Sequence, residues 1–147
     1  MDYLILDLKL LARYLKKNYK KYCILRLFNI YGKNQPENFF IPDINKKIKL
    51  QKEIRLNKSI RDFIHVNDVV KILNFIIKNN INDTINVGSG YGKPLISVVK
   101  MVSSKNKIKP LVKTTNKKDK LIANINKLRS IGYKSKIDKI NEKNFNI

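Results

Sequence analysis

The chain has 147 residues, enough for one ordinary domain, and its 43% of hydrophobic residues excludes a disordered tail as a description of the whole. Its formal net charge is +21, which raises the question of nucleic-acid binding. The excess is lysine spread along the whole chain, however, and arginine occurs only at positions 13, 26, 55, 61 and 129. Nucleic-acid binding is therefore an alternative and not the leading interpretation.

Other classes of protein are also excluded by the composition. No stretch approaches the roughly 20 apolar residues that a membrane helix needs, and the first residues carry no secretory signal. Cys23 is the only cysteine and His65 the only histidine, so the chain can form no intrachain disulfide and no zinc site built from thiolates. We predict no metal site, no membrane association and a cytoplasmic location.

The first half of the sequence alternates between helical and extended patterns, which indicates the α/β class. Apolar residues at helical spacing predict a helix over 7–20. A short apolar run over 23–31, ended by Gly32, is typical of a parallel strand that is buried on both faces. Pro42 can open a helix that continues through Ile48.

The second half continues this alternation. The predicted elements are a short strand at 54–56, a strand at 62–66, a helix at 69–79 capped by Asn67 or Asp68, a strand at 84–87, a helix at 94–103, a strand at 108–113, and a helix at 120–131 closed by Gly132. His65 alternates with apolar neighbours in its strand, which favours a structural role over that of a base. Beyond Lys134 the sequence is polar, and we expect a frayed tail.

The segment Gly88-Ser89-Gly90-Tyr91-Gly92 superficially matches a dinucleotide-binding loop, because it lies between a predicted strand and a predicted helix. The third glycine comes one position early, with Lys93 in its place, and no acidic residue ends a strand about 20 residues later. We interpret the segment as a turn in which glycine supplies positive φ.

Three segments, in this order and spacing, resemble motifs of the NAD-dependent epimerases/dehydratases of the extended short-chain dehydrogenase/reductase family. They are LRLFNIYG at 25–32, RDFIHVNDV at 61–69 and INVGSG at 85–90, and the helix leading to Gly132-Tyr133 is similar to the helix that closes the family's fold. The resemblance covers nearly the whole chain. It implies NAD as the cofactor and a nucleotide-diphosphate sugar as the ligand.

The resemblance also implies roles for individual residues. Asn29 matches the asparagine whose amide holds the phosphate–sugar portion of the substrate, at the strand end where open α/β sheets bind ligands. Arg61 matches the arginine that binds the nucleotide diphosphate. Phe28 matches the position whose main chain lies against the nicotinamide. The positions at which the family encloses the base are Phe39, Ile54 and Leu56.

The sequence departs from the family where the catalysis takes place. The family's glycine-rich cofactor-binding segment has no counterpart here. The resemblance makes Lys9 the lysine of the catalytic Tyr-x-x-x-Lys pair, but Ile5 stands in the tyrosine's position and Tyr3 is two residues out of register. We therefore expect neither tight NAD binding nor turnover by this chain alone, and leave open whether it is an enzyme.

Together these patterns predict a single domain over 1–147, the C-terminal part of a Rossmann-like parallel sheet with a small substrate-binding α/β subdomain. Its predicted parts are a remnant of the cofactor-binding sheet (1–33), a substrate-binding part (34–135) and a polar tail (136–147). The implied function is the nucleotide-sugar-binding portion of a truncated epimerase/dehydratase, with a separate cofactor-binding half or a second copy of the chain as candidate partner. The alternatives are a basic nucleic-acid-binding module and a non-catalytic nucleotide-sugar binder. The sequence does not distinguish truncated, degenerate and split forms, nor does it identify the sugar, the base or the product.

Overall fold

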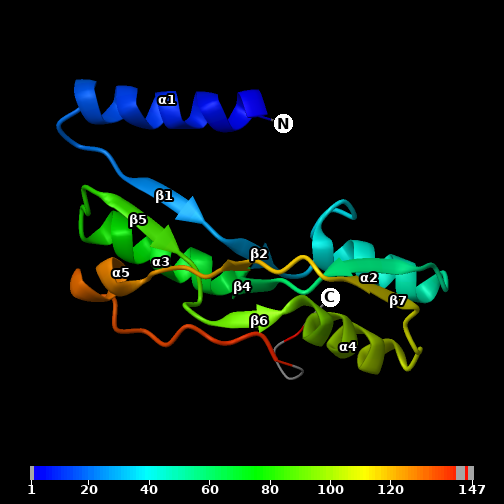
Figure 1. The fold of residues 1–147 in the computed structure, drawn as a ribbon. Helices are drawn as coiled ribbons and strands as arrows, with labels where there is room; N and C mark the ends of the chain where they lie inside the picture. The colour runs from blue at the N-terminus through cyan, green and yellow to red at the C-terminus, as the bar shows by residue number, and fades with distance from the viewer. Residues whose placement is uncertain (1, 142–144, 146–147) are drawn as a thin grey trace.

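The computed structural model describes residues 2–141 and 145, with side chains from residue 10 on (Figure 1). In it, the apolar run predicted as one strand forms two strands, β1 (Ile24–Leu27) and β2 (Asn29–Tyr31). β1 pairs in parallel with β5 (Thr84–Val87), and β2 pairs in parallel with β4 (Ile60–His65). Between them the Phe28 N–H donates to the Val87 carbonyl at 3.0 Å. The run thus passes from one sheet into the next, and Phe28 is the residue between the two strands.

Strand β4 lies at the centre of the pairing. It pairs with β2 and β8 (Lys120–Leu121) in parallel and with β6 (Gly92–Pro94) in the antiparallel sense. A separate parallel pair joins β3 (Ile54–Asn57) to β7 (Val112–Thr115). This mostly parallel arrangement confirms the predicted α/β class with a Rossmann-like sheet.

Alternate residues of β4 enter two hydrophobic cores, as the pleat of a strand requires. Ile64 belongs to the core that α3 (Val66–Lys78) covers, together with β5 residues and Leu128 of α5 (Asn126–Ser130). Phe63 belongs to the core between α2 (Phe40–Lys49) and α4 (Leu95–Asn106). Figure 1 shows α3 and α5 toward one end of the molecule and α2 and α4 toward the other.

All but one of the predicted helices are present over most of their predicted length, although their ends are shifted. α1 spans Asp2–Asn18, and α3 begins at Val66, where His65 is the N-cap in place of Asn67 or Asp68. The prediction of a helix over 120–131 was wrong for its first half. Residues 120–125 form β8 and a stretch without regular structure, in which the Ala123 N–H donates to the buried Asp62 carboxylate, and only Asn126–Ser130 is helical, as α5. The strand predicted at 108–113 lies at Val112–Thr115.

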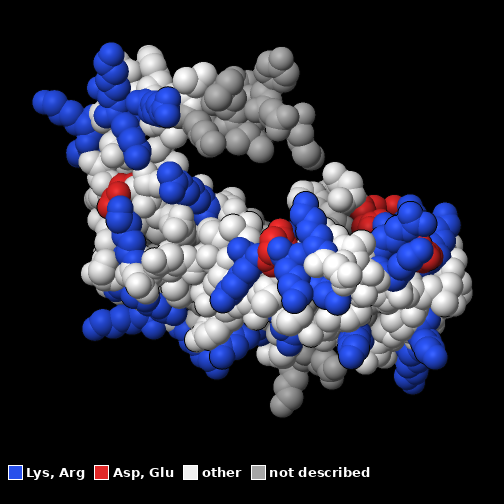
Figure 2. Space-filling view, in the orientation of Figure 1, with Lys and Arg blue, Asp and Glu red and all other residues white. Residues whose placement is uncertain are grey.

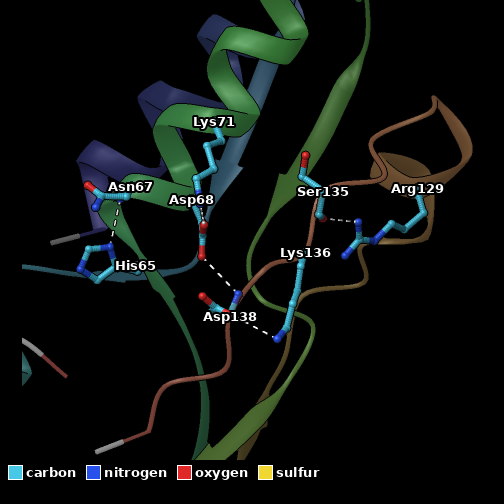
Figure 3. Close-up of polar contacts among 8 residues, drawn as sticks. All are labelled: His65, Asn67, Asp68, Lys71, Arg129, Ser135, Lys136 and Asp138. Atoms are coloured by element: carbon cyan, nitrogen blue, oxygen red, sulfur yellow. Dashed lines mark hydrogen bonds and ion pairs between the residues drawn. The ribbon is translucent and has the colours of Figure 1, made fainter. Parts of the chain in front are cut away.

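The described part of the tail, residues 135–141 and 145, is packed and not frayed, which corrects the expectation for these residues; residues 142–144 and 146–147 lie outside the described residues. Ile137, Ile140 and Phe145 are each less than 5% exposed, and they extend the two cores. Figure 3 shows the polar contacts that fix the start of the tail: the Asp138 N–H donates to the Asp68 carboxylate at 3.2 Å, and Arg129 donates to the Ser135 carbonyl at 2.8 Å. A few apolar residues suffice to anchor a segment of polar average composition.

Positive charge is dispersed over the face shown in Figure 2. Lysine and arginine side chains lie on all parts of that face, with acidic residues among them, and do not line a single groove. Among the helices described here, none has the length and apolarity required to cross a membrane.

Candidate functional site

The strand register brings Asn29 and Arg61 to the same face of the sheet. Asn29 lies directly opposite Phe63 in the parallel pair of β2 with β4, so their side chains share a face. Arg61 precedes Phe63 by two residues in the same strand and therefore points to that face as well. Residues 32 positions apart in sequence are thus both neighbours of Phe63 on one face, Asn29 across the strand pair and Arg61 along the same strand.

A groove of about 340 Å³ opens beside Asn29 on this face. It is lined by aromatic side chains from three segments, namely Phe28, Phe39, Phe40 and Phe63, and by Asn29 and Gln35 among others. Phe39 is 50% exposed at the start of α2, and the rings of Phe40 and Phe63 pack at 6.1 Å between centroids. Flat apolar walls with two carboxamides suit a ligand that carries a ring and several hydrogen-bonding groups.

Asn29 is oriented by the strand beside it. Its Nδ2 donates to the Asp62 carbonyl at 2.7 Å, which fixes the plane of the amide. Asn29 itself is exposed, and its side chain forms no second hydrogen bond within the part of the chain that the structure describes. The Oδ1 acceptor and the second N–H are therefore available to a ligand in the groove.

Arg61 is held in a two-pronged ion pair with Asp119. Nη1 donates to Oδ1 at 2.9 Å and Nη2 donates to Oδ2 at 2.6 Å, while Nη1 also donates to the Ile60 carbonyl at 3.0 Å. The Arg61 guanidinium lowers the pKa of the Asp119 carboxyl to about 2. The Arg61 side chain is 24% exposed, and three of its five N–H donors are used, so two remain for an anion.

Asp62 points to the opposite face and organises the turn after β5. Its fully buried carboxylate accepts hydrogen bonds from the Ser89 N–H, the Ser89 hydroxyl, the Gly90 N–H and the Ala123 N–H. Gly90 has a φ of 77°, as expected for the predicted turn. The amides that a dinucleotide-binding loop would direct at phosphate are thus directed at a carboxylate. Among the described residues, this turn therefore supplies no pyrophosphate cradle for NAD.

The other predicted site residues lie in different surroundings. Phe28 is half-buried at the rim of the groove, with its N–H already bonded to Val87. Ile54 and Leu56 are 2% and 5% exposed in the hydrophobic core, which differs from the prediction that their side chains contact a base. They face inward because the strand alternates, leaving Arg55 and Asn57 exposed. The side chain of Lys9, on α1, lies outside the described residues.

The roles of two residues in and near this site were not predicted from the sequence. Asp119 is the only acid in a run of lysines over 117–120, and that isolation is a signal of a specific partner. In the sequence, Asp62 is one residue of the segment RDFIHVNDV and has no predicted role of its own. Its burial in the structure identifies it as the centre of a hydrogen-bond network. No cluster of three or more potential metal ligands is found in the part of the chain that the structure describes.

Comparison with known proteins identifies the family of the chain. The sequence profile of the NAD dependent epimerase/dehydratase family matches residues 8–88, more than half of the chain. No curated protein sequence matches significantly.

Solved structures share the fold over part of their length. A UDP-N-acetylglucosamine 4-epimerase from Methanobrevibacter ruminantium, in complex with UDP-N-acetylmuramic acid, is 24% identical with a TM-score of 0.71, over 85% of this chain and 44% of that one. A dTDP-glucose 4,6-dehydratase from Bacillus anthracis in complex with NAD is 18% identical with a TM-score of 0.73, over 88% and 44%. The Bordetella bronchiseptica enzyme WbmG with NAD and UDP is 20% identical with a TM-score of 0.73, over 86% and 43%. The chain thus spans less than half the length of these structures.

Proposed function

This chain belongs to the NAD-dependent epimerase/dehydratase family, and from that premise we propose that it forms the nucleotide-sugar-binding part of a nucleotide-sugar epimerase or dehydratase. The observation that carries the proposal is an aromatic groove lined by Asn29 and Phe63, with Arg61 outside its lining but on the same face, two residues before Phe63. An amide with a free acceptor and a guanidinium with free donors suit a sugar and a diphosphate respectively.

Within this proposal the groove holds the ligand in an extended pose. Asn29 binds the phosphate–sugar portion, Arg61 binds the diphosphate, and Phe39 offers an exposed ring for stacking. The side chains of Ile54 and Leu56 stabilise β3 from the hydrophobic core and do not contact the ligand. Solved structures of similar fold have been obtained with UDP-glucose and with UDP-N-acetylmuramic acid, which supports this ligand class.

In this proposal NAD is bound mainly by a separate cofactor-binding part that works together with this chain. From this chain, Phe28 contacts the cofactor. The turn that follows β5 is occupied by Asp62 and offers NAD no phosphate site. Lys9 is our candidate for the catalytic lysine, and because Ile5 stands four residues before it, the tyrosine's role falls to another group. In this proposal the protein acts in the cytoplasm.

The outer edge of β1 is the place where such a cofactor-binding part would dock. Within the described residues β1 pairs with β5 only, so its other edge has unpaired backbone groups. Beside that edge lies an apolar groove of about 480 Å³, lined by Leu11 and Leu15 of α1 and by β1 itself. Leu11 and Leu27 are each 52% exposed there. A parallel strand added to β1 would satisfy the backbone and cover these leucines.

The test is to titrate the 147-residue chain with UDP, dTDP, UDP-glucose and NAD by calorimetry. We expect the nucleotide diphosphates and the sugar nucleotide to bind, and Arg61→Gln and Asn29→Ala to weaken that binding by about tenfold or more. Lys100→Gln, on an exposed helical position, is the control. If none of these nucleotides bound even at millimolar concentration, the proposal would be wrong.

Activity assays distinguish one half of a two-part enzyme from a non-catalytic binder of nucleotide-sugars. Epimerase and dehydratase assays are run on the chain alone and after mixing with the separately expressed cofactor-binding half of a related enzyme. Turnover only after mixing indicates one half of a two-part enzyme, whereas nucleotide-sugar binding without turnover in either case indicates a non-catalytic binder. Tight, salt-resistant binding to DNA near 0.15 M salt would instead favour a nucleic-acid-binding module.

A further inference from the structure

Lys93 lies directly opposite Arg61 in the antiparallel pair of β6 with β4. Directly opposed residues in such a pair share a face, and their Cβ atoms are about 4.5–5.5 Å apart. Lys93 therefore points to the face that carries Arg61, Phe63 and Asn29. In the sequence, Lys93 stands where a dinucleotide-binding loop would have its third glycine.

The charges around this pair do not balance. Two cations directly opposite each other destabilise a sheet. The acid paired with Arg61, Asp119, is held in a two-pronged ion pair, and it is flanked in sequence by Lys117, Lys118 and Lys120. Lys93, Arg61 and this short segment thus contribute five cations and one carboxylate.

Lys93 is the partly buried member of this group that has no partner among the described residues; the side chains of Lys117, Lys118 and Lys120 are also unpaired there, but those residues are exposed. The Lys93 side chain forms no ion pair and no hydrogen bond with any residue from the described part of the chain, although the residue is partly buried. A partly buried, unpaired ammonium beside a guanidinium is costly unless an anion joins them. The arrangement is therefore suited to an added anion with more than one negative charge.

We infer that Lys93 is a second cation of the diphosphate site, and that Arg61 and Lys93 together hold the two phosphates of the nucleotide. The inference rests on the proposed function and adds a binding residue to it. Asp119 fixes the guanidinium so that its two free N–H donors are directed at one phosphate, while Lys93 supplies a point charge to the other. The spacing of the two side chains across the strand pair suits adjacent phosphates.

The experiment compares nucleoside diphosphates with monophosphates, because Lys93 is assigned to only one of the two phosphates. UDP and UMP, and in parallel dTDP and dTMP, are titrated into the full chain and into Lys93→Met. We expect the diphosphate to bind about tenfold or more weaker in Lys93→Met, and the monophosphate to change by less than about threefold. Lys93→Arg should retain most of the affinity for diphosphate.

Lys100→Met removes the same charge from α4 and is the matched control, and thermal unfolding of each variant verifies folding. Equal losses in Lys93→Met and Lys100→Met would overturn the inference, since net charge alone would explain them. Diphosphate binding that depends on Arg61 but not on Lys93 would overturn the inference and leave the proposed function in place. Failure of the unmodified chain to bind any nucleotide would overturn both.

Discussion

Asp62 and Ser89 are joined by two hydrogen bonds to one carboxylate oxygen, from the Ser89 N–H at 2.8 Å and from the Ser89 hydroxyl at 2.5 Å. The other oxygen accepts from the Gly90 and Ala123 N–H groups at 2.9 and 3.1 Å. One buried carboxylate on β4 thus fixes both the turn after β5 and the segment after β8. The same strand presents Arg61 on its opposite face.

Asp62→Ala is expected to lower the free energy of unfolding by about 3 kcal/mol or more, because three backbone N–H groups lose a buried acceptor. Asp62→Asn keeps one oxygen and should cost less. Urea unfolding followed by circular dichroism measures the difference. Asp43→Ala, which removes an exposed i,i+4 pair with Lys47, should cost less than about 1 kcal/mol. Similar losses for Asp62→Ala and Asp43→Ala would show that the network contributes little.

Gly88→Ala should destabilise the fold through a steric clash and not through backbone strain. An added Cβ would fall against Ala123 Cβ and within 2.9 Å of Asp62 Oδ2. We expect a loss of about 2 kcal/mol or more. Gly132→Ala is the contrasting case, because its φ is 96° and nothing lies within 4 Å, so only the conformational cost of about 1–2 kcal/mol applies. A harmless Gly88→Ala would contradict the close packing described for the turn.

The ion pair of Arg61 with Asp119 should make stability depend on pH in the acid range. Arg61 lowers the pKa of Asp119 to about 2 in the folded chain, from its ordinary value of 3.8. The unfolded chain therefore binds more protons between these values, so this contribution to stability is complete above about pH 4 and is lost as the pH falls toward 2. Asp119→Asn and Arg61→Gln should each remove it. An NMR titration of the Asp119 carboxyl with a midpoint near 4 would contradict the prediction.

His65 should act as a helix cap. Its Nδ1 accepts a hydrogen bond from the Asn67 N–H at 3.2 Å, and its ring meets Tyr31 edge-on at 5.1 Å (Figure 3 shows the cap). His65→Ala is expected to cost about 1 kcal/mol, and His65→Asn, which can cap in the same way, should restore part of that loss. Chemical denaturation of the three proteins tests this. Equal stability of His65→Ala and the unmodified chain would exclude a capping role.

The unpaired edge of β1 should make the isolated chain associate with itself as its concentration rises. Leu27→Lys, at a position 52% exposed beside that edge, should shift the association to higher concentration in analytical ultracentrifugation. Ile77→Lys is the control, since Ile77 is 71% exposed on α3, away from the edge. An equal effect of the two substitutions would show that general surface hydrophobicity drives association.

Local patterns in the sequence were sufficient for several elements. The strand at 84–87 was predicted with the ends that it has, and the helix that became α3 was predicted from its apolar stripe. The glycine-rich segment after β5 was predicted as a turn, and Gly90 has the positive φ expected there. These features depend on neighbours within a few residues, which is the range over which periodicity is informative.

Features that depend on distant partners were decided only by the tertiary structure. The run at 23–31 divides at Phe28 because its two parts pair with different strands, and periodicity carries no record of which strand lies alongside. The described part of the tail is packed because Ile137, Ile140 and Phe145 reach cores built by segments far away in sequence. The resemblance named Asn29 and Arg61 from the sequence, but their common face follows from a strand register, and Asp119 and Lys93 join Arg61 only through pairing with β4. Hydrophobic spacing predicts which face of a helix or strand is buried, whereas hydrogen bonding between separate strands determines which residues meet.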